Sequence, residues 1–233
     1  MKTLRPRLLR LAALASLGLS GLAVAQTLTP EQVYARNAPS VWRVSTYDAD
    51  NLPLGQGSGV VIGPERIVTN CHVLKGARQV AVRREKDKLP ARLAMWDVQR
   101  DVCLLQVSGL KAPVVTLADS ARFAVGQDVY AIGNPKGLDL TMSAELLSAL
   151  RKDDAGRLIL LQTSAAISGG SSGGGLFDER GALMGLTTLG SVKADAQNLN
   201  FAIPVDWVRE LPPRHAKLNT AAASPAAAAA SAP

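Results

Sequence analysis

Histidine, cysteine and aromatic residues are scarce in this sequence. Its 233 residues include two histidines, two cysteines, and three each of Trp, Tyr and Phe. The sequence pI of about 9.7 raises the question of a nucleic-acid partner. The Lys and Arg residues are scattered, however, and they form no basic stripe interleaved with aromatic side chains. The composition therefore excludes nucleic acid as the partner.

No apolar run after residue 25 is long enough to span a bilayer. The first 25 residues combine a basic start, an apolar stretch from Leu11 to Val24, and the small-x-small pattern Ala23-Val24-Ala25. They predict a secretory signal peptide cleaved before Gln26, and hence a periplasmic or secreted protein. A retained membrane anchor is the alternative, but a spanning helix needs about 20 unbroken apolar residues. Gln26 is not a cysteine, so no lipid anchor is expected there.

Loss of the signal also changes the charge. The segment carries four basic residues and no acidic ones, so the net charge falls from +7 to +3. At the other end, residues 219–233 are almost all Ala with Ser and Pro, and we expect a disordered tail over 214–233. One folded domain is expected over residues 26–213, long enough to bury a substantial core.

The folded part has an all-β pattern. Thr29-Pro30-Glu31-Gln32 is typical of a helix start, and that helix should end near Pro39. A last helix is expected from Val205 or Asp206 to Leu211, stopped by Pro212-Pro213. Between them, short Val-, Ile- and Leu-rich runs separated by turn residues predict an antiparallel sandwich or pair of barrels. Examples of these runs are Val41–Thr46, Gly57–Ile62, Arg66–Thr69, Gln79–Arg83, Val102–Val107, Val129–Ile132, Leu158–Thr163 and Ala182–Thr188.

Of the two histidines, His72 is the candidate general base. It follows Ile67–Cys71, an apolar strand running into a polar turn, and this places the imidazole at a strand end. His215 lies beyond Pro212-Pro213, where a solvated surface position is expected.

A glycine- and serine-rich segment is the candidate nucleophile loop. A nucleophilic serine needs a tight turn and nearby backbone N–H groups that bind the developing oxyanion, and glycines permit such a turn. Ser172 has Gly170 two residues before it and two glycines directly after it, whereas Ser171 does not. We expect Ser172 as the nucleophile and the N–H groups of Gly170 and Ser172 as the oxyanion donors.

Asp101 is the candidate third member. Strand alternation places it on one face with Cys103 and Leu105, and an acid in line with core residues needs a partner. Asp97 competes for the role, but its polar surroundings are typical of a turn. The chain order His72, Asp101, Ser172 is the order of the chymotrypsin-type triad.

With these residues in view, the sequence resembles the protease domain of HtrA/Deg-type trypsin-like serine peptidases over most of residues 38–211. The resemblance rests on five segments in order: Gly57–Ile62 with Ile67–Val73, Asp101–Leu105, Ala131–Leu138, Gln162–Gly174 and Asn200–Pro204. It implies two antiparallel six-stranded β-barrels, at about 38–113 and 123–206. It also implies endoproteolysis of polypeptides, unfolded proteins included, without a cofactor.

By the same resemblance, Ala166 and Gly190 should line the specificity pocket and Thr188 should support Asp101. The absence of an acidic residue in the pocket implies a small or medium apolar side chain before the scissile bond. The nucleophile loop departs from the family, because two prolines are replaced by Gly169 and Gly175. The loop is therefore expected to be more flexible than in relatives. No PDZ domain is expected after Leu211.

The two cysteines flank the two expected triad residues, since Cys71 precedes His72 and Cys103 follows Asp101 by two positions. If the triad forms, the cysteines must lie close together, and an exported protein favours oxidation. We therefore expect a Cys71–Cys103 disulfide. Two buried free thiols are one alternative. A metal site that includes His72 is another, but it uses up the base, and its spacing fits no common zinc pattern.

The sequence thus predicts an exported serine endopeptidase. Two other functions remain open. One is a catalytically inactive binding or chaperone-like protein with the same fold. The other is an acyl-transfer enzyme that acts on small esters, although the all-β pattern does not favour the strand–turn–helix of the α/β-hydrolases.

Overall fold

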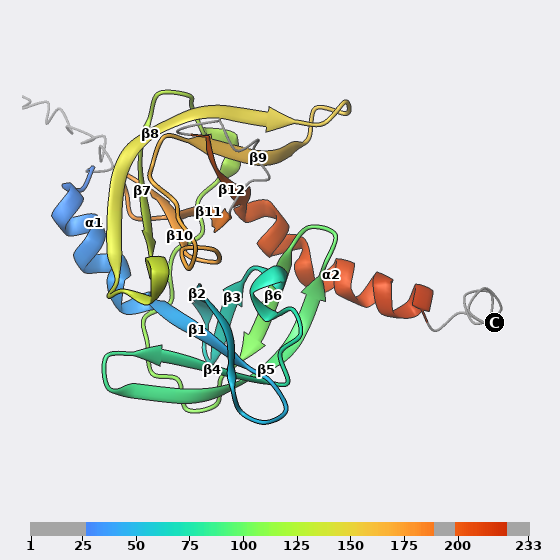
Figure 1. Ribbon diagram of the computed structural model, residues 1–233. Coiled ribbons are helices and arrows are strands. Elements are labelled where there is room, and N and C mark those ends of the chain that lie inside the picture. The colour runs from blue at the N-terminus through green and yellow to red at the C-terminus, as the bar shows by residue number, and fades with distance from the viewer. Residues whose placement is uncertain (1–26, 189–198, 223–233) are drawn as a thin grey trace, which may run out of the picture.

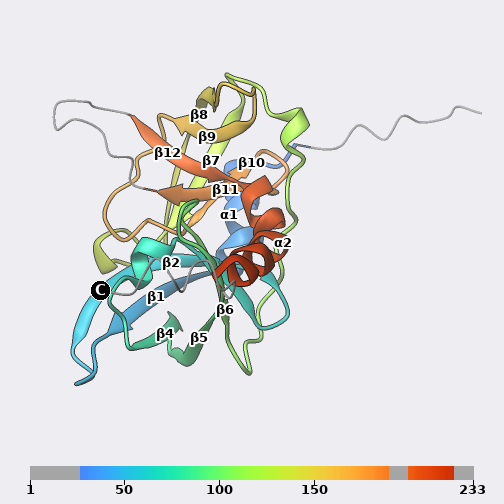
Figure 2. The same cartoon turned by 90° about the vertical axis from the view of Figure 1, so that its right-hand side faces the viewer.

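The computed structural model of the protein describes residues 27–188 and 199–222. The expected signal peptide, Gly190 and residues 223–233 lie outside these ranges. Two β-barrels lie one above the other, with one helix beside them and another running past both (Figure 1 and Figure 2).

Each barrel contains six strands and is closed. The first has the strand order β1-β2-β3-β6-β5-β4, and the second has the order β10-β11-β12-β9-β8-β7, with antiparallel pairing throughout. The expected all-β fold of two six-stranded barrels is confirmed. The strands of the first barrel are β1 Val41–Tyr47, β2 Pro53–Gly63, β3 Arg66–Thr69, β4 Gln79–Arg84, β5 Asp87–Asp97 and β6 Val102–Gln106. Those of the second are β7 Asp128–Gly133, β8 Thr141–Lys152, β9 Leu158–Thr163, β10 Gly175–Asp178, β11 Leu183–Thr188 and β12 Asn200–Pro204.

Each barrel has its own apolar core, and a third cluster lies between the barrels. In the first barrel Trp42 and Ile67 are buried inside, and in the second Leu147 and Leu161 are. The cluster between them takes side chains from both barrels and from both helices, among them Val60, Val68, Leu104, Ile132, Phe177, Val33 and Leu211. Burial of apolar surface in this shared cluster fixes the two barrels against each other.

The N-terminal helix α1, Pro30–Asn37, begins as the sequence predicted. The Thr29 hydroxyl accepts from the N–H of Gln32, and the Gln32 side chain accepts from the N–H of Thr29. This reciprocal capping box satisfies two N–H groups that a helix start otherwise leaves unpaired. The short 3₁₀ helix η1, Ala38–Ser40, follows and leads directly into β1.

The C-terminal helix α2, Val205–Ala222, corrects the expectation that it ends at Leu211. It continues through Pro212 and Pro213 for two further turns, so the expected tail at 214–233 is helical up to Ala222. Prolines inside a helix remove hydrogen bonds and disfavour its continuation. Here contacts with the first barrel hold the second half in place, because α2 passes β5 and β6 (Figure 1). His215 packs edge-on against Trp96, with ring centroids 4.3 Å apart.

Candidate active site

His72 lies at the end of a strand, as expected. Strand β3 ends at Thr69, and the 3₁₀ helix η2, Cys71–Leu74, turns the chain so that the imidazole lies at the surface of the first barrel. The His72 side chain is 44% exposed. Its ring is therefore accessible from the protein surface and does not pack into the core.

Asp101 lies just before β6 and not within it. Its backbone φ is +57°, in the left-handed region, so the expected strand alternation with Cys103 does not extend to it. This conformation costs a non-glycine residue about 1–2 kcal/mol. The contacts of Asp101 offset that cost, because its carbonyl oxygen accepts from the Cys71 N–H at 3.3 Å and from Asn70 Nδ2 at 3.0 Å.

The Asp101 carboxylate holds His72 at two points. Oδ1 accepts from the backbone N–H of His72 at 2.8 Å, and Oδ2 lies 2.7 Å from Nδ1 of the ring. An ionised carboxylate can only accept, so the ring proton lies on Nδ1. In the neutral tautomer with this proton, Nε2 is the free acceptor, which is the arrangement that a general base requires.

Ser172 is presented by a loop of the second barrel that needs its glycines. Gly173 has φ +84°, and a Cβ there would lie 2.2 Å from the carbonyl oxygen of Ser58. A Cβ on Gly174 would lie 2.5 Å from the carbonyl oxygen of Ile132. The Ser58 N–H donates to the Ser172 carbonyl at 2.8 Å, which joins the loop to β2 of the first barrel.

His72 and Ser172 line the same surface pocket of about 250 Å³, together with Gly170, Leu54 and Lys75. Ser172 Oγ is buried and makes no hydrogen bond within the described part of the chain. Catalytic hydrogen bonds are often long in unliganded structures and shorten when substrate binds. Ser171, the rival nucleophile, does not line this pocket but a second, smaller cavity.

The two expected oxyanion donors are the backbone N–H groups of Gly170 and Ser172. The carbonyl of Gly169 accepts from the N–H of Lys136 at 2.6 Å. In a trans peptide the N–H points opposite to the C=O, so the Gly170 N–H points away from Lys136. Within residues 27–188 and 199–222, the N–H groups of Gly170 and Ser172 have no backbone partner.

Gly170 cannot be replaced without strain. Its φ is +93°, and a Cβ would lie 2.6 Å from the Asn134 carbonyl oxygen and 2.8 Å from the Lys136 nitrogen. The close approach to this segment, which includes the 3₁₀ helix η4, Pro135–Gly137, orients the Gly169–Gly170 peptide. A glycine is therefore required at this position.

A disulfide joins Cys71 and Cys103 in the structure, with their Cα atoms 5.0 Å apart. It links the residue before His72 to the β6 position two residues after Asp101. Among the described residues there is no group of His, Cys, Asp and Glu side chains that could hold a metal ion.

Three expected residues remain: Ala166 and Gly190 of the specificity pocket, and Thr188 as the support of Asp101. Ala166 is exposed and lines the smaller cavity of about 150 Å³ with Ser171, while Gly190 lies outside the described residues. Thr188, at the end of β11, is buried and has no hydrogen bond to Asp101 among the described residues. Its expected role stays a prediction.

Sequence reasoning missed Ser58 as a functional residue. Its hydroxyl donates to the Gly170 carbonyl at 2.9 Å and accepts from the Asn134 N–H at 2.8 Å. It therefore connects the nucleophile loop to the segment that orients the Gly169–Gly170 peptide. A serine between two glycines in an otherwise apolar strand was the available signal.

Comparison with known proteins shows the family to which the chain belongs. Residues 57–186 match the trypsin-like peptidase domain. The chain belongs to this family. It is 37% identical over 194 residues to Protease Do-like 1, chloroplastic, of Arabidopsis thaliana, which covers 78% of this chain and 44% of that protein. It is 34% identical to a probable periplasmic serine endoprotease DegP-like of Pseudomonas putida, which covers 75% of this chain and 38% of that protein.

Solved structures of HtrA-type proteases are also similar. The S227A variant of AlgW with a tripeptide superposes with a TM-score of 0.71 at 31% identity, over 78% of this chain and 62% of that one. The chain spans less than half the length of the curated relatives cited above. No helix among the described residues is long and apolar enough to cross a membrane.

The disulfide should contribute substantially to stability. Replacing both cysteines, Cys71→Ala with Cys103→Ala, removes a cross-link that closes a loop with a sequence separation of 32. Chain entropy then predicts a loss of about 3–4 kcal/mol in the free energy of unfolding. Urea denaturation of the oxidised protein and the double variant measures it. Equal unfolding midpoints would show that the bond contributes nothing.

Gly170→Ala should suppress the reactivity of Ser172. The added Cβ displaces the Gly169–Gly170 peptide, and loss of one oxyanion donor lowers the rate of fluorophosphonate labelling by about 10²–10³-fold. Gly169→Ala is the matched control, because a Cβ there meets nothing within 4 Å. If folded Gly170→Ala labels at the wild-type rate, its N–H is not a donor.

Proposed function

We propose that this chain is an exported serine endopeptidase in which His72, Asp101 and Ser172 act as the catalytic triad. The observation that carries the proposal is the Asp101-oriented imidazole of His72 in one pocket with Ser172. Family membership supports the same conclusion, since the relatives cited above are named as proteases. The substrates are polypeptides, and the proposed chemistry uses protein side chains, backbone groups and water.

In the proposed reaction, Ser172 Oγ attacks the carbonyl carbon of the scissile peptide as Nε2 of His72 takes the hydroxyl proton. The negative charge on the carbonyl oxygen is stabilised by the N–H groups of Gly170 and Ser172. The protonated imidazole then gives its proton to the leaving amine, and an acyl-enzyme remains. Water deprotonated by His72 hydrolyses the ester, and the proton returns to Ser172.

Export is part of the same proposal. Residues 1–25 have the sequence features of a cleaved signal peptide, and the Pseudomonas relative is named as periplasmic. The Cys71–Cys103 disulfide is also suited to an oxidising compartment. These three observations support a periplasmic or secreted location.

A second candidate function is a binding or chaperone-like protein with an inactive site. It is favoured by one observation: Ser172 is only 3% exposed, and its Oγ has no hydrogen-bond partner among the described residues. If Ser172 never forms a hydrogen bond with His72, the protein can bind peptides but cannot cleave them. Labelling of the serine separates the two functions.

Fluorophosphonate should label the mature protein, residues 26–233, at Ser172 only. Intact mass should show one adduct on the wild type and on Ser171→Ala, and none on Ser172→Ala, because only Ser172 shares a pocket with His72. An adduct on Ser172→Ala would reassign the nucleophile. No adduct on any folded form would favour the binding protein.

We further propose a preference for small or medium apolar side chains before the scissile bond. The cavity of about 150 Å³ that Ala166 lines with Ile132 and Thr187 supports this size, and none of the described residues that line it is acidic. A peptide library should show cleavage after Ala or Val at least about 10-fold faster than after Arg or Phe. Strict cleavage after Arg or Lys would contradict the preference.

A further inference from the structure

A buried carboxylate lies four residues before Asp101, outside the proposed triad. Asp97, the last residue of β5, is 1% exposed. The expected turn begins directly after Asp97, but Asp97 itself is buried and ends β5. A buried carboxylate is stable only when it is paired and hydrogen-bonded, so its partners define its role.

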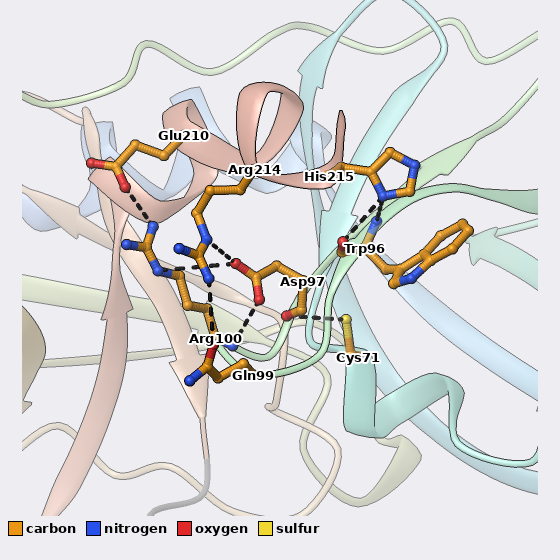
Figure 3. Close-up of polar contacts among 8 residues, drawn as sticks. All are labelled: Cys71, Trp96, Asp97, Gln99, Arg100, Glu210, Arg214 and His215. Carbon is orange, nitrogen blue, oxygen red and sulfur yellow. Dashed lines mark hydrogen bonds and ion pairs between the residues drawn. The ribbon is translucent and has the colours of Figure 1, made fainter. Parts of the chain in front are cut away.

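The nearer of the two charged partners of Asp97 comes from the distal half of α2. Arg214 Nε donates to Asp97 Oδ2 at 2.5 Å, and Arg100 Nε lies 3.9 Å from the same oxygen (Figure 3). Arg100 in turn pairs with Glu210 and lies over the Trp207 ring at 4.9 Å. Figure 3 shows Arg214 and Glu210 reaching from the helix toward Asp97 and Arg100.

The same carboxylate closes the turn that leads to Asp101. Asp97 Oδ1 accepts from the Arg100 N–H at 3.3 Å, and the Asp101 N–H donates to the Val98 carbonyl at 3.2 Å. The backbone of Asp97 also borders the disulfide, since its carbonyl oxygen lies 3.9 Å from Cys71 Sγ. Asp97 thus fixes the start of the turn that leads to Asp101. The turn ends at Asp101, which has a left-handed backbone and holds His72.

We propose that Arg214 is a positioning residue for the triad and acts through Asp97. The guanidinium fixes the buried carboxylate, the carboxylate fixes the turn, and the turn holds Asp101 in its left-handed conformation against His72. The inference rests on the proposed function for its effect on catalysis. It also predicts an effect on the His72–Asp101 contact that is measurable without any substrate.

The helix offers a matched control in Arg209. This arginine pairs with Asp206 at 3.1 Å and donates to the Ala118 carbonyl, so it holds the helix to the second barrel without touching the turn. Arg214→Gln and Arg209→Gln each remove one guanidinium and one ion pair from α2. A merely structural role for Arg214 predicts that both folded variants behave alike.

The experiment compares peptide hydrolysis and the imidazole ¹H–¹⁵N spectrum of ¹⁵N-histidine-labelled protein. Only His72 and His215 give signals, and His72→Ala assigns them. Arg214→Gln should lower kcat by about 10- to 100-fold with little change in KM, because a small displacement of the base affects the chemical step. The Nδ1–H signal of His72 should shift or broaden. Arg209→Gln should leave both unchanged.

A double variant tests whether Arg214 acts through Asp97. Asp97→Asn with Arg214→Gln leaves no buried unpaired charge, and the Asn carbonyl can still accept from the Arg100 N–H. Its kcat should exceed that of Arg214→Gln alone. If Arg214→Gln does not fold, Arg214→Lys takes its place under the same criteria.

Wild-type kcat with an unchanged His72 signal in the folded Arg214 variant would overturn the proposal. A double variant with no higher kcat than Arg214→Gln would overturn the route through Asp97. If the wild type neither hydrolyses peptides nor labels with fluorophosphonate, the proposed function has failed. The His72 signal then still decides whether Arg214 positions Asp101.

Discussion

The contact between Asp101 and the segment Asn70–His72 is the constraint on which the site depends. Asp101 accepts four hydrogen bonds from this segment, two at its carbonyl oxygen and two at its carboxylate. These bonds join the end of β3 to the start of β6, and the disulfide joins the same two segments covalently. Together they hold a left-handed aspartate that isolated backbone preferences disfavour. The orientation and tautomer of His72 follow from this arrangement.

The proposed nucleophile, Ser172, belongs to the other barrel, so the proposed site exists only where the two barrels pack together. The apolar cluster between the barrels fixes their distance. Ser58 fixes how they are aligned at the site. Its N–H binds the Ser172 carbonyl, and its hydroxyl binds both Gly170 and Asn134. One residue of β2 therefore connects the serine loop, with its proposed oxyanion donors, to the first barrel. The geometry of the proposed site therefore depends on the packing between the barrels.

The helix α2 adds a second connection between the barrels, from the outside. Its proximal half packs Val208 and Leu211 into the inter-barrel cluster, and its distal half carries Arg214 to Asp97. Pro212 and Pro213 separate the two halves, yet the helix continues because its distal half is anchored by side chains. A buried charge that must be paired is a strong anchor, since leaving it unpaired costs about 3–5 kcal/mol. The cost of two prolines of about 3 kcal/mol each is thus opposed by tertiary contacts.

The sequence by itself determined the fold class, the capping box of α1, and the segments that carry His72, Asp101 and Ser172. These features depend on local pattern: turn chemistry, strand-like apolar runs and glycines around a serine. The apolar runs taken as examples did not include β5, β8, β10 and β12. In β5 and β8 exposed or polar positions dilute the apolar signal, and β10 and β12 are only 4 and 5 residues long. Only the tertiary structure decided the end of α2, the burial of Asp97, the left-handed backbone of Asp101 and the linking role of Ser58. Each of these depends on a partner distant in sequence, whose contacts overrode the local preference.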